Sequence, residues 1–167
     1  MKRRLALWLT LAAGSATAQE GRPVAYGKVL DLIGTAQWRV LVYVPYLTDA
    51  RMADALRAAT VDSTRRVRVV VLTVPFFAAK EDSLSNSLAL AGAGVVEAQV
   101  ASTTAYVLVD DDLFSSAQLG RTANVSDLRV LPRTASNTFL TWFAGAVKAG
   151  RTVTNYEAFM RIGGRLK

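Results

Sequence analysis

Two apolar runs separated by a helical segment limit the possible folds of this chain more than any other feature of its sequence. The runs extend from Trp38 to Tyr46 and from Val67 to Val74 and consist almost entirely of β-branched, aliphatic and aromatic residues. Such runs are typical of strands covered on both faces, as the parallel strands of α/β proteins are. Between them, apolar residues repeat at helical spacing through about Thr60, with Thr48 as the expected N-cap. The sequence therefore predicts a right-handed βαβ unit.

The segments around this unit predict further elements of one α/β domain. We expect helices in 29–34, 84–91, 138–148 and the tail from 152, and strands in 95–100, 105–109, 113–114 and 128–131. Asp82 or Ser83 is the expected cap of the second of these helices, and Ser136 or Asn137 that of the third. Residues 19–27 and the stretch after Pro75 are expected to be loops. The predicted fold is α/β, with a mixed, mostly parallel sheet flanked by helices.

Residues 1–18 have the parts of a secretory signal peptide. The basic residues Lys2 to Arg4 precede an apolar run from Leu5 to Ala13, and Ala16 to Ala18 form a small-x-small ending. The apolar run is too short to span a bilayer. We therefore predict export to the periplasm or the extracellular space, with a single domain in 19–167. This domain has a net charge of +4 rather than +7, because the leader holds three basic residues and none of the 13 acidic ones.

The absence of histidine and cysteine excludes more chemistry than any residue that is present. The chain has none of either, so no imidazole can act as base, nucleophile or metal ligand. Zinc and iron–sulfur sites lose their usual ligands, and no disulfide can form. Carboxylate, hydroxyl, lysine and arginine chemistry remains. We therefore expect neither a metal nor another cofactor.

Residues 101–120 form the segment in which a site is most readily placed. Alternating apolar residues before and after Asp110-Asp111-Asp112 predict two strands joined by a tight turn. The hairpin would carry four hydroxyl side chains towards one rim: Thr103, Thr104, Ser115 and Ser116. Adjacent carboxylates attract divalent cations, but consecutive residues at a strand end point to opposite faces. A solvated turn is therefore the simpler interpretation of the three acids.

The order of the predicted elements resembles half of the phospholipase D superfamily fold, in particular its small secreted bacterial endonuclease-like members. The run from Trp38 to Tyr46 resembles the first strand of that fold, and residues 52–57 and 66–72 resemble the segments that follow. Ala91 to Val96 is similar to a Gly-Val stretch of the family, and Phe139 to Trp142 is similar to its F-x-x-W pair. The resemblance covers nearly all of the chain after the leader and implies a phospholipase D-like half-fold.

In that family the next strand carries H-x-K-x4-D, followed after a short hairpin by G-S-x-N. For a complete motif, the resemblance implies that the histidine is the nucleophile and that the lysine and the asparagine neutralise phosphoryl oxygens. It also implies that the aspartate orients the paired histidine. With Asp110 on the motif aspartate, Thr103 stands at the histidine position and Ala105 at the lysine position. Ala117-Gln118-Leu119-Gly120 lies about where G-S-x-N should be, and the preceding Ser115-Ser116 pair supplies only hydroxyls. We therefore expect no catalytic residue and the loss of the family's reaction.

Basic and aromatic residues near predicted strand ends are candidates for ligand contact. Three cations lie in loops that border the site rim in the resembling fold: Lys80, Arg121 and Arg133. Phe76 and Phe77 follow a strand end and could form a base-stacking or lipid-contacting platform, or pack over the edge of the sheet. A second basic cluster could touch phosphates, although a solvated helix face is its simpler explanation. It contains Arg51, Arg57, Arg65, Arg66 and Arg68.

These features predict an exported, catalytically inactive phospholipase D-like domain that binds nucleic acid or another phosphate-bearing anion. A half-fold implies a homodimer in which the two 103–110 segments face each other across the axis. Two alternatives remain open. One is a divergent phosphodiesterase, nuclease or phospholipase that uses Asp110 with Thr103 or Ser115, and the other is a cell-envelope interaction scaffold. Beyond the leader, no apolar run is long and uncharged enough for a transmembrane helix.

Overall fold

The computed structural model of the chain describes residues 21–163. The predicted signal peptide, residues 1–18, lies outside these residues, as does the end of the predicted C-terminal helix at 164–167. Within the described range, no helix combines the length and the apolar character that are needed to cross a bilayer.

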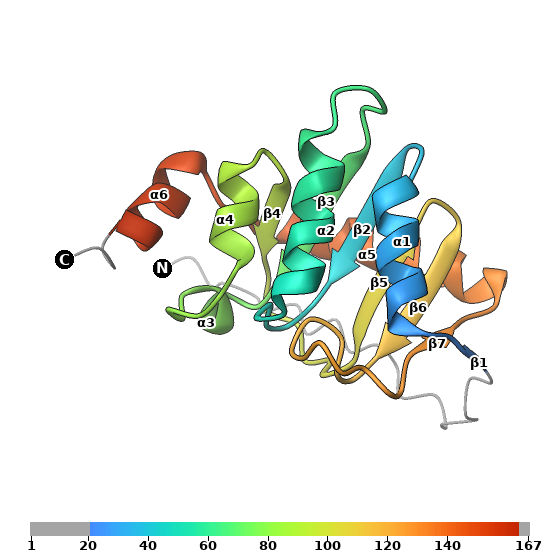
Figure 1. Ribbon diagram of the computed structural model, residues 1–167. Coiled ribbons are helices and arrows are strands. Elements are labelled where there is room, and N and C mark those ends of the chain that lie inside the picture. Colours follow the sequence, from blue (N-terminus) through green and yellow to red (C-terminus); the bar gives the residue numbers. More distant parts are fainter. Residues whose placement is uncertain (1–20, 164–167) are drawn as a thin grey trace.

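Helices and strands alternate through the first half of the chain (Figure 1). The helices are α1 (Tyr26–Thr35), α2 (Ala50–Val61), α3 (Pro75–Ala78), α4 (Ser85–Leu90), α5 (Arg133–Ala149) and α6 (Asn155–Gly163). The strands are β1 (Arg22–Pro23), β2 (Arg39–Tyr43), β3 (Arg68–Thr73), β4 (Gly94–Glu97), β5 (Ala105–Val109), β6 (Asp112–Ser116), β7 (Arg129–Val130) and β8 (Arg151–Thr152). The predicted βαβ unit is confirmed as β2, α2 and β3, and the predicted hairpin as β5 and β6.

One eight-stranded sheet, in the order β1-β7-β6-β5-β2-β3-β4-β8, organises the described residues. The pairs β2–β3 and β3–β4 are parallel, whereas the other five neighbouring pairs are antiparallel. The prediction of a mixed sheet flanked by helices is therefore confirmed, but its mostly parallel character is wrong. The reason is that the tight β5–β6 hairpin reverses the chain beside β2, and the short edge strands then pair in the antiparallel sense.

Helices cover both faces of the sheet (Figure 1). On β2, Val40 and Val42 lie in the core shared with α1, α2, α4 and α6, whereas Leu41 and Tyr43 face α5. Successive strand side chains point to opposite faces, so a strand that is apolar at nearly every position needs cover on both sides. The apolar run that begins at Trp38 is thus explained by its central place between two helical layers.

A buried carboxylate joins the C-terminal helix α6 to the sheet. Glu97, the last residue of β4, has a side chain that is 2% exposed. Its two oxygens pair with Arg151 of β8 and Arg161 of α6, each at 2.5 Å. Arg161 also donates to the side-chain oxygen of Asn86 in α4 at 3.3 Å. These contacts satisfy a carboxylate that would be costly to bury alone.

The first residues of two helices differ from the predicted caps. Asp49, not Thr48, caps α2, and its carboxylate accepts a hydrogen bond from the helix backbone at 3.0 Å. Thr48 instead donates its hydroxyl to a carbonyl of the loop after β6 at 3.1 Å. The N-cap of α4 is Leu84, without a side-chain cap, so neither Asp82 nor Ser83 has the predicted role.

Other boundaries also move because pairing and packing extend the elements. Helix α5 begins at Arg133 after Pro132, which places Ser136 and Asn137 inside the helix. A short helix, α3, replaces the loop that was predicted after Pro75. The predicted loop at 19–27 contains β1 and the start of α1, because β1 pairs with β7.

Candidate functional site

Four segments meet along one edge of the sheet, which we call the rim. It comprises residues 45–48, 74–80, 101–105 and 116–121. They meet there because β2 and β3 are parallel, β5 is antiparallel to β2, and β6 is antiparallel to β5. In Figure 1 the rim is the lower edge of the sheet, where α3 lies. Most of the predicted site residues gather at this edge: Phe76, Phe77, Lys80, Thr103, Ala105, Ser116 and Arg121, with Ser115 next to it.

Asp110 lies at the opposite edge of the sheet, in the β5–β6 turn. Its carboxylate accepts hydrogen bonds from the backbone N–H groups of Gln37, Trp38 and Arg39 at 3.0, 3.1 and 3.2 Å. Its φ of 51° is left-handed, a region that aspartate tolerates better than most residues. The length of β5, roughly 20 Å of extended chain, separates Asp110 from Thr103. Asp110 therefore anchors the start of β2 and does not orient a group at the rim.

The residues at the histidine and lysine positions carry no charge. Thr103 is exposed in the segment before β5. Ala105 is 1% exposed and packs in the core shared with α1 and α2. The rim therefore has a hydroxyl where the resembling family has its nucleophile, and a buried methyl group where that family has its ammonium.

The two serines at the end of β6 do not form a hydroxyl pair, because consecutive strand residues point to opposite faces. Ser116 is 4% exposed and donates its hydroxyl to the carboxylate of Asp127. The same hydroxyl oxygen accepts hydrogen bonds from the backbone N–H groups of residues 118 and 119, at 2.9 and 3.2 Å. Ser116 and Asp127 thus hold the turn after β6. The sequence gives no periodic signal for Asp127, since it comes from a loop.

Gly120 ties that turn to the start of α2. Its carbonyl oxygen accepts hydrogen bonds from the backbone N–H groups of Thr48 and Asp49 at 2.7 and 2.9 Å. Its φ is +79°, and a Cβ at this position would lie 2.9 Å from Cγ1 of Val44. Gly120 is the last residue of the segment that stands in place of G-S-x-N. The backbone here leaves no room for the asparagine side chain of that motif.

Arg121 is an exposed cation at the rim, close to the phenol of Tyr43. The Tyr43 hydroxyl donates to the carbonyl of Ser102 at 2.6 Å and so joins the 101–104 segment to β2. Burial raises the pKa of Tyr43 to about 12, although the positive charge of Arg121 acts in the opposite direction. Arg121 therefore supplies positive charge beside the segment that carries Thr103.

Three aromatic rings and an ammonium group gather around α3. Phe77 stacks on Tyr46 with ring centroids 5.2 Å apart, and Phe76 meets Phe77 edge-on at 5.2 Å. The Nζ atom of Lys80 lies 5.2 to 5.3 Å from all three ring centroids. The Tyr46 hydroxyl donates to Asp82, and this hydrogen bond raises the pKa of Tyr46. Tyr46 was not among the predicted site residues, although its place directly after Pro45 at a strand end is a usable signal.

Arg133 does not border the rim, contrary to expectation. It begins α5 and forms an ion pair with Asp111 at 3.3 Å in the β5–β6 turn, where Arg39 also pairs with Asp111 at 3.3 Å. Helix α5 starts beside this turn because β7 is short and antiparallel to β6. Of the three predicted cations, Lys80 and Arg121 lie at the rim and Arg133 lies at the far edge. Across residues 21–163, no three acidic side chains are grouped so that they could hold a metal ion.

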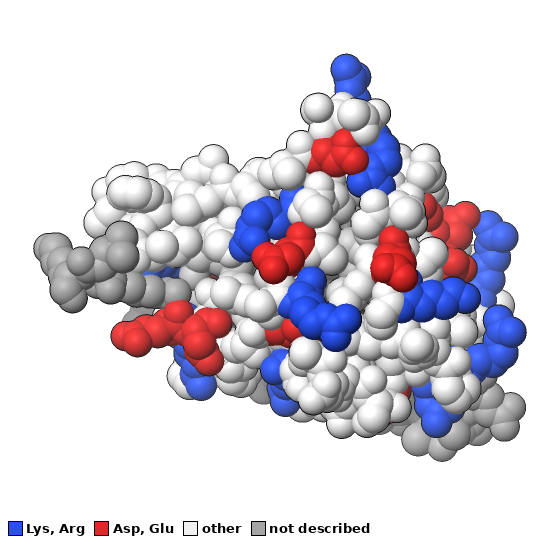
Figure 2. Space-filling model, viewed as in Figure 1, with Lys and Arg blue, Asp and Glu red and all other residues white. Residues whose placement is uncertain are grey.

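Two arginines of the second basic cluster form local ion pairs. Arg57 pairs with Asp54 at 2.5 Å, and Arg65 pairs with Asp62 at 2.6 Å. Figure 2 shows basic and acidic side chains interspersed over the face covered by α1 and α2. A functional phosphate-binding face would carry a large patch of one sign. A solvated helix surface therefore explains this cluster.

Comparisons with known proteins give a match in structure. No protein-family model matches the sequence, and no curated protein matches it. Nuc from Salmonella typhimurium, a phospholipase D family member, superposes with a TM-score of 0.64 and 18% identity over 77% of this chain and 90% of Nuc. NucT from Helicobacter pylori gives a TM-score of 0.60 and 11% identity, over 76% of this chain and 89% of NucT.

A third solved structure is TrmBL2, an archaeal chromatin protein with a novel mode of DNA binding. It gives a TM-score of 0.54 and 13% identity over 75% of this chain and 50% of TrmBL2. Identities this low speak to architecture and not to activity. The chain has the fold of the phospholipase D superfamily.

Proposed function

We propose that the protein is a catalytically inactive phospholipase D-like domain that binds nucleic acid, or another phosphate-bearing anion, through the rim. The observation that carries this proposal is the geometry at Gly120. A Cβ at this position would lie 2.9 Å from Cγ1 of Val44, so the motif asparagine does not fit unless its neighbours move. The position of the motif asparagine is therefore occupied by a tightly packed glycine.

The other motif positions support the loss of the family's reaction. Thr103 has a hydroxyl with no imidazole anywhere in the chain to activate it, and Ala105 is buried. An unactivated hydroxyl is a poor nucleophile near neutral pH. The cations at the rim, Lys80 and Arg121, can still attract a phosphate. Binding without turnover is the function that this combination favours.

The neighbours in structure support nucleic acid as the anion. DNA binding is stated for TrmBL2, whose similarity covers 75% of this chain. The rim adds the combination that nucleic acids require, namely cations for phosphates and aromatic faces for bases. Both belong to residues 74–80 and 116–121.

Geometry argues against the alternative in which Asp110 assists a hydroxyl in hydrolysis. The carboxylate of Asp110 is engaged by three backbone N–H groups at the far edge of the sheet. General acid–base catalysis needs a group within hydrogen-bond reach of the reacting atoms. Neither Thr103 nor Ser115 lies within that reach.

The proposal is tested by fluorescence anisotropy with labelled DNA at low and moderate salt. We expect binding that weakens steeply with salt, and further weakening in Arg121→Ala. Arg68→Ala, at an exposed arginine at the start of β3, is the matched control and should bind like the wild type. A nuclease and phospholipase assay with and without divalent metal should show no turnover. Turnover that is lost in Asp110→Ala would overturn the inactive assignment, and salt-insensitive or absent binding would favour the envelope scaffold.

Homodimer formation and export are part of the same proposal and rest on the resemblance and on residues 1–18. We propose that two copies meet at the Thr103 end of the 103–110 segment, because β5 lies inside the sheet with helices over both faces. Sedimentation velocity at several concentrations tests the dimer, and N-terminal sequencing of the secreted product tests cleavage after Ala18.

A further inference from the structure

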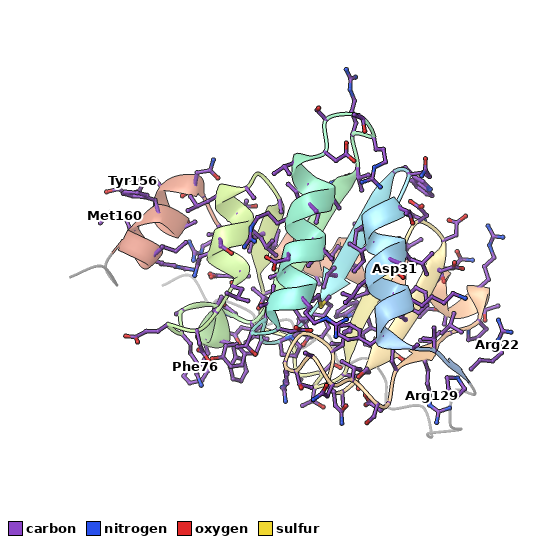
Figure 3. The ribbon with its side chains drawn as sticks, in the orientation of Figure 1. Arg22, Asp31, Phe76, Arg129, Tyr156 and Met160 are labelled. Atoms are coloured by element: carbon purple, nitrogen blue, oxygen red, sulfur yellow. The ribbon has the colours of Figure 1, made fainter. Side chains whose placement is uncertain are left out.

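The most exposed aromatic ring of the rim, Phe76, lies on a backbone segment that is hydrogen-bonded to its neighbours. Phe76 is 68% exposed, and Figure 3 shows it projecting at the edge of the molecule near α3. Helix α3 starts with Pro75, and the N–H groups of residues 77 and 78 both bond to the Val74 carbonyl at 3.0 Å. The carbonyl of Ala78 accepts a hydrogen bond from the Asn86 side chain at 3.1 Å. The backbone under Phe76 is thus tied to β3 and α4.

One neighbouring ring, Phe77, contacts Phe76 and limits the orientations that it can take. Phe76 is edge-on to Phe77, and Phe77 is stacked on Tyr46. The hydroxyl of Tyr46 is held by Asp82. A ring that is braced in this way loses little conformational freedom when a planar ligand stacks on it. Its apolar face is exposed to water, although burial of a phenylalanine side chain is favourable.

On this arrangement we propose that Phe76, Phe77 and Tyr46 form a stacking platform for an unpaired base, so that the rim prefers single-stranded over double-stranded nucleic acid. This inference rests on the proposed function and specifies its ligand. In a duplex the base faces are covered by neighbouring base pairs, whereas a single strand can turn a base onto an aromatic ring. The ammonium of Lys80, within 5.3 Å of each ring, puts positive charge beside the stacked base.

The charges around the platform favour a flexible strand over a lipid surface. Glu81 and Asp82 are exposed directly after Lys80, and acidic side chains gather on the lower left of Figure 2, near α3. A flat anionic membrane would meet these carboxylates together with the ring and would be repelled. A single strand can place one base on Phe76 and keep its other phosphates away from Glu81 and Asp82.

The test compares a labelled oligothymidine with a hairpin duplex, measured by fluorescence anisotropy on the full mature chain. We expect the wild type to bind the single strand more tightly, and Phe76→Ala to weaken single-strand binding about tenfold with no change for the duplex. Phe76→Trp, unlike Phe76→Ala, should bind the single strand like the wild type, because the larger ring preserves the stacking face. Tyr156→Ala, at a tyrosine of α6 that is 73% exposed, is the matched control and should bind like the wild type.

The outcomes separate this inference from the proposed function. If Arg121→Ala weakens both probes but Phe76→Ala weakens neither, the platform is overturned and the proposed function stands. If the wild type binds neither probe, both are overturned. If Phe76→Ala abolishes binding to vesicles that contain phosphatidylglycerol and leaves the oligothymidine unaffected, the ring contacts lipid and the base-stacking platform is overturned.

Discussion

Gly120 lies against Val44 so closely that a Cβ on the glycine would be 2.9 Å from a methyl group of the valine. The contact joins the turn after β6 to the end of β2. It exists because the Gly120 carbonyl accepts two hydrogen bonds from the start of α2, which hold the backbone at a φ of +79°. The close packing of Gly120 against Val44 therefore depends on the absence of a side chain at the position of the motif asparagine.

Replacing this glycine should destabilise the protein. Gly120→Ala adds the cost of a left-handed backbone to the overlap with Val44, and we expect the free energy of unfolding in urea to fall by about 2–4 kcal/mol. Gly145→Ala is the control, because Gly145 lies inside α5 and a Cβ there meets nothing within 4 Å. That variant should be stabilised by about 0.5–1 kcal/mol. Equal effects of the two substitutions would contradict the close contact at Gly120.

Removing the Asp110 side chain should affect stability and leave DNA binding intact. Asp110→Ala deletes the acceptor of three backbone N–H groups and puts alanine at a φ of 51°. We expect a loss of about 2–4 kcal/mol in urea unfolding. Asp110→Asn keeps an acceptor and tolerates the left-handed backbone, so its loss should be smaller. A fully stable Asp110→Ala variant that has lost DNA binding would contradict the anchoring role.

The ion pairs of Glu97 with Arg151 and Arg161 should stabilise the packing of α6 on the sheet. Glu97→Gln removes the charge that pairs with Arg151 and Arg161, and we expect the free energy of unfolding to fall by about 1.5–3 kcal/mol, the contribution of hydrogen bonds to charged groups. The substitution should increase the rate of amide hydrogen exchange more in α6 than in β2. Asp54→Asn is the control, because the Asp54–Arg57 pair is exposed on α2 and should contribute little. Unchanged exchange in α6 would show that packing alone holds the helix.

Alkaline pH should destabilise the protein through Tyr43. Its pKa is about 12 in the folded protein and 10.0 in its unperturbed state, so the unfolded chain loses this proton first. The stabilising contribution is complete below pH 10 and is lost as the pH rises through about 12, at about 1.4 kcal/mol per pH unit between these values. Tyr43→Phe should flatten this part of the curve and should remove the hydrogen bond to Ser102. An unchanged alkaline curve in that variant would assign the loss to other groups.

Patterns along the chain were sufficient to predict the layers of the fold. The apolar residues of 39–43 and 68–73 demand cover on both faces, and helical spacing between them demands a crossover, because burial depends on local periodicity. The sheet directions could not be predicted in the same way. The antiparallel pairing of β5 with β2 depends on where a reversed hairpin docks, and no residue within it encodes that choice.

The site divides along the same line. The missing chemistry follows from the residues alone, because a chain without histidine and cysteine has no imidazole or thiolate whatever its fold. Phe76, Lys80 and Arg121 were also predicted as site residues from their places near strand ends. Which strand ends share an edge depends instead on how the strands pair in three dimensions. In the fold, Tyr46 stacks on Phe77, and Gly120 packs against Val44. Asp110 and Arg133 lie at the far edge of the sheet. These outcomes depend on pairing between segments far apart in the chain, which composition and periodicity do not encode.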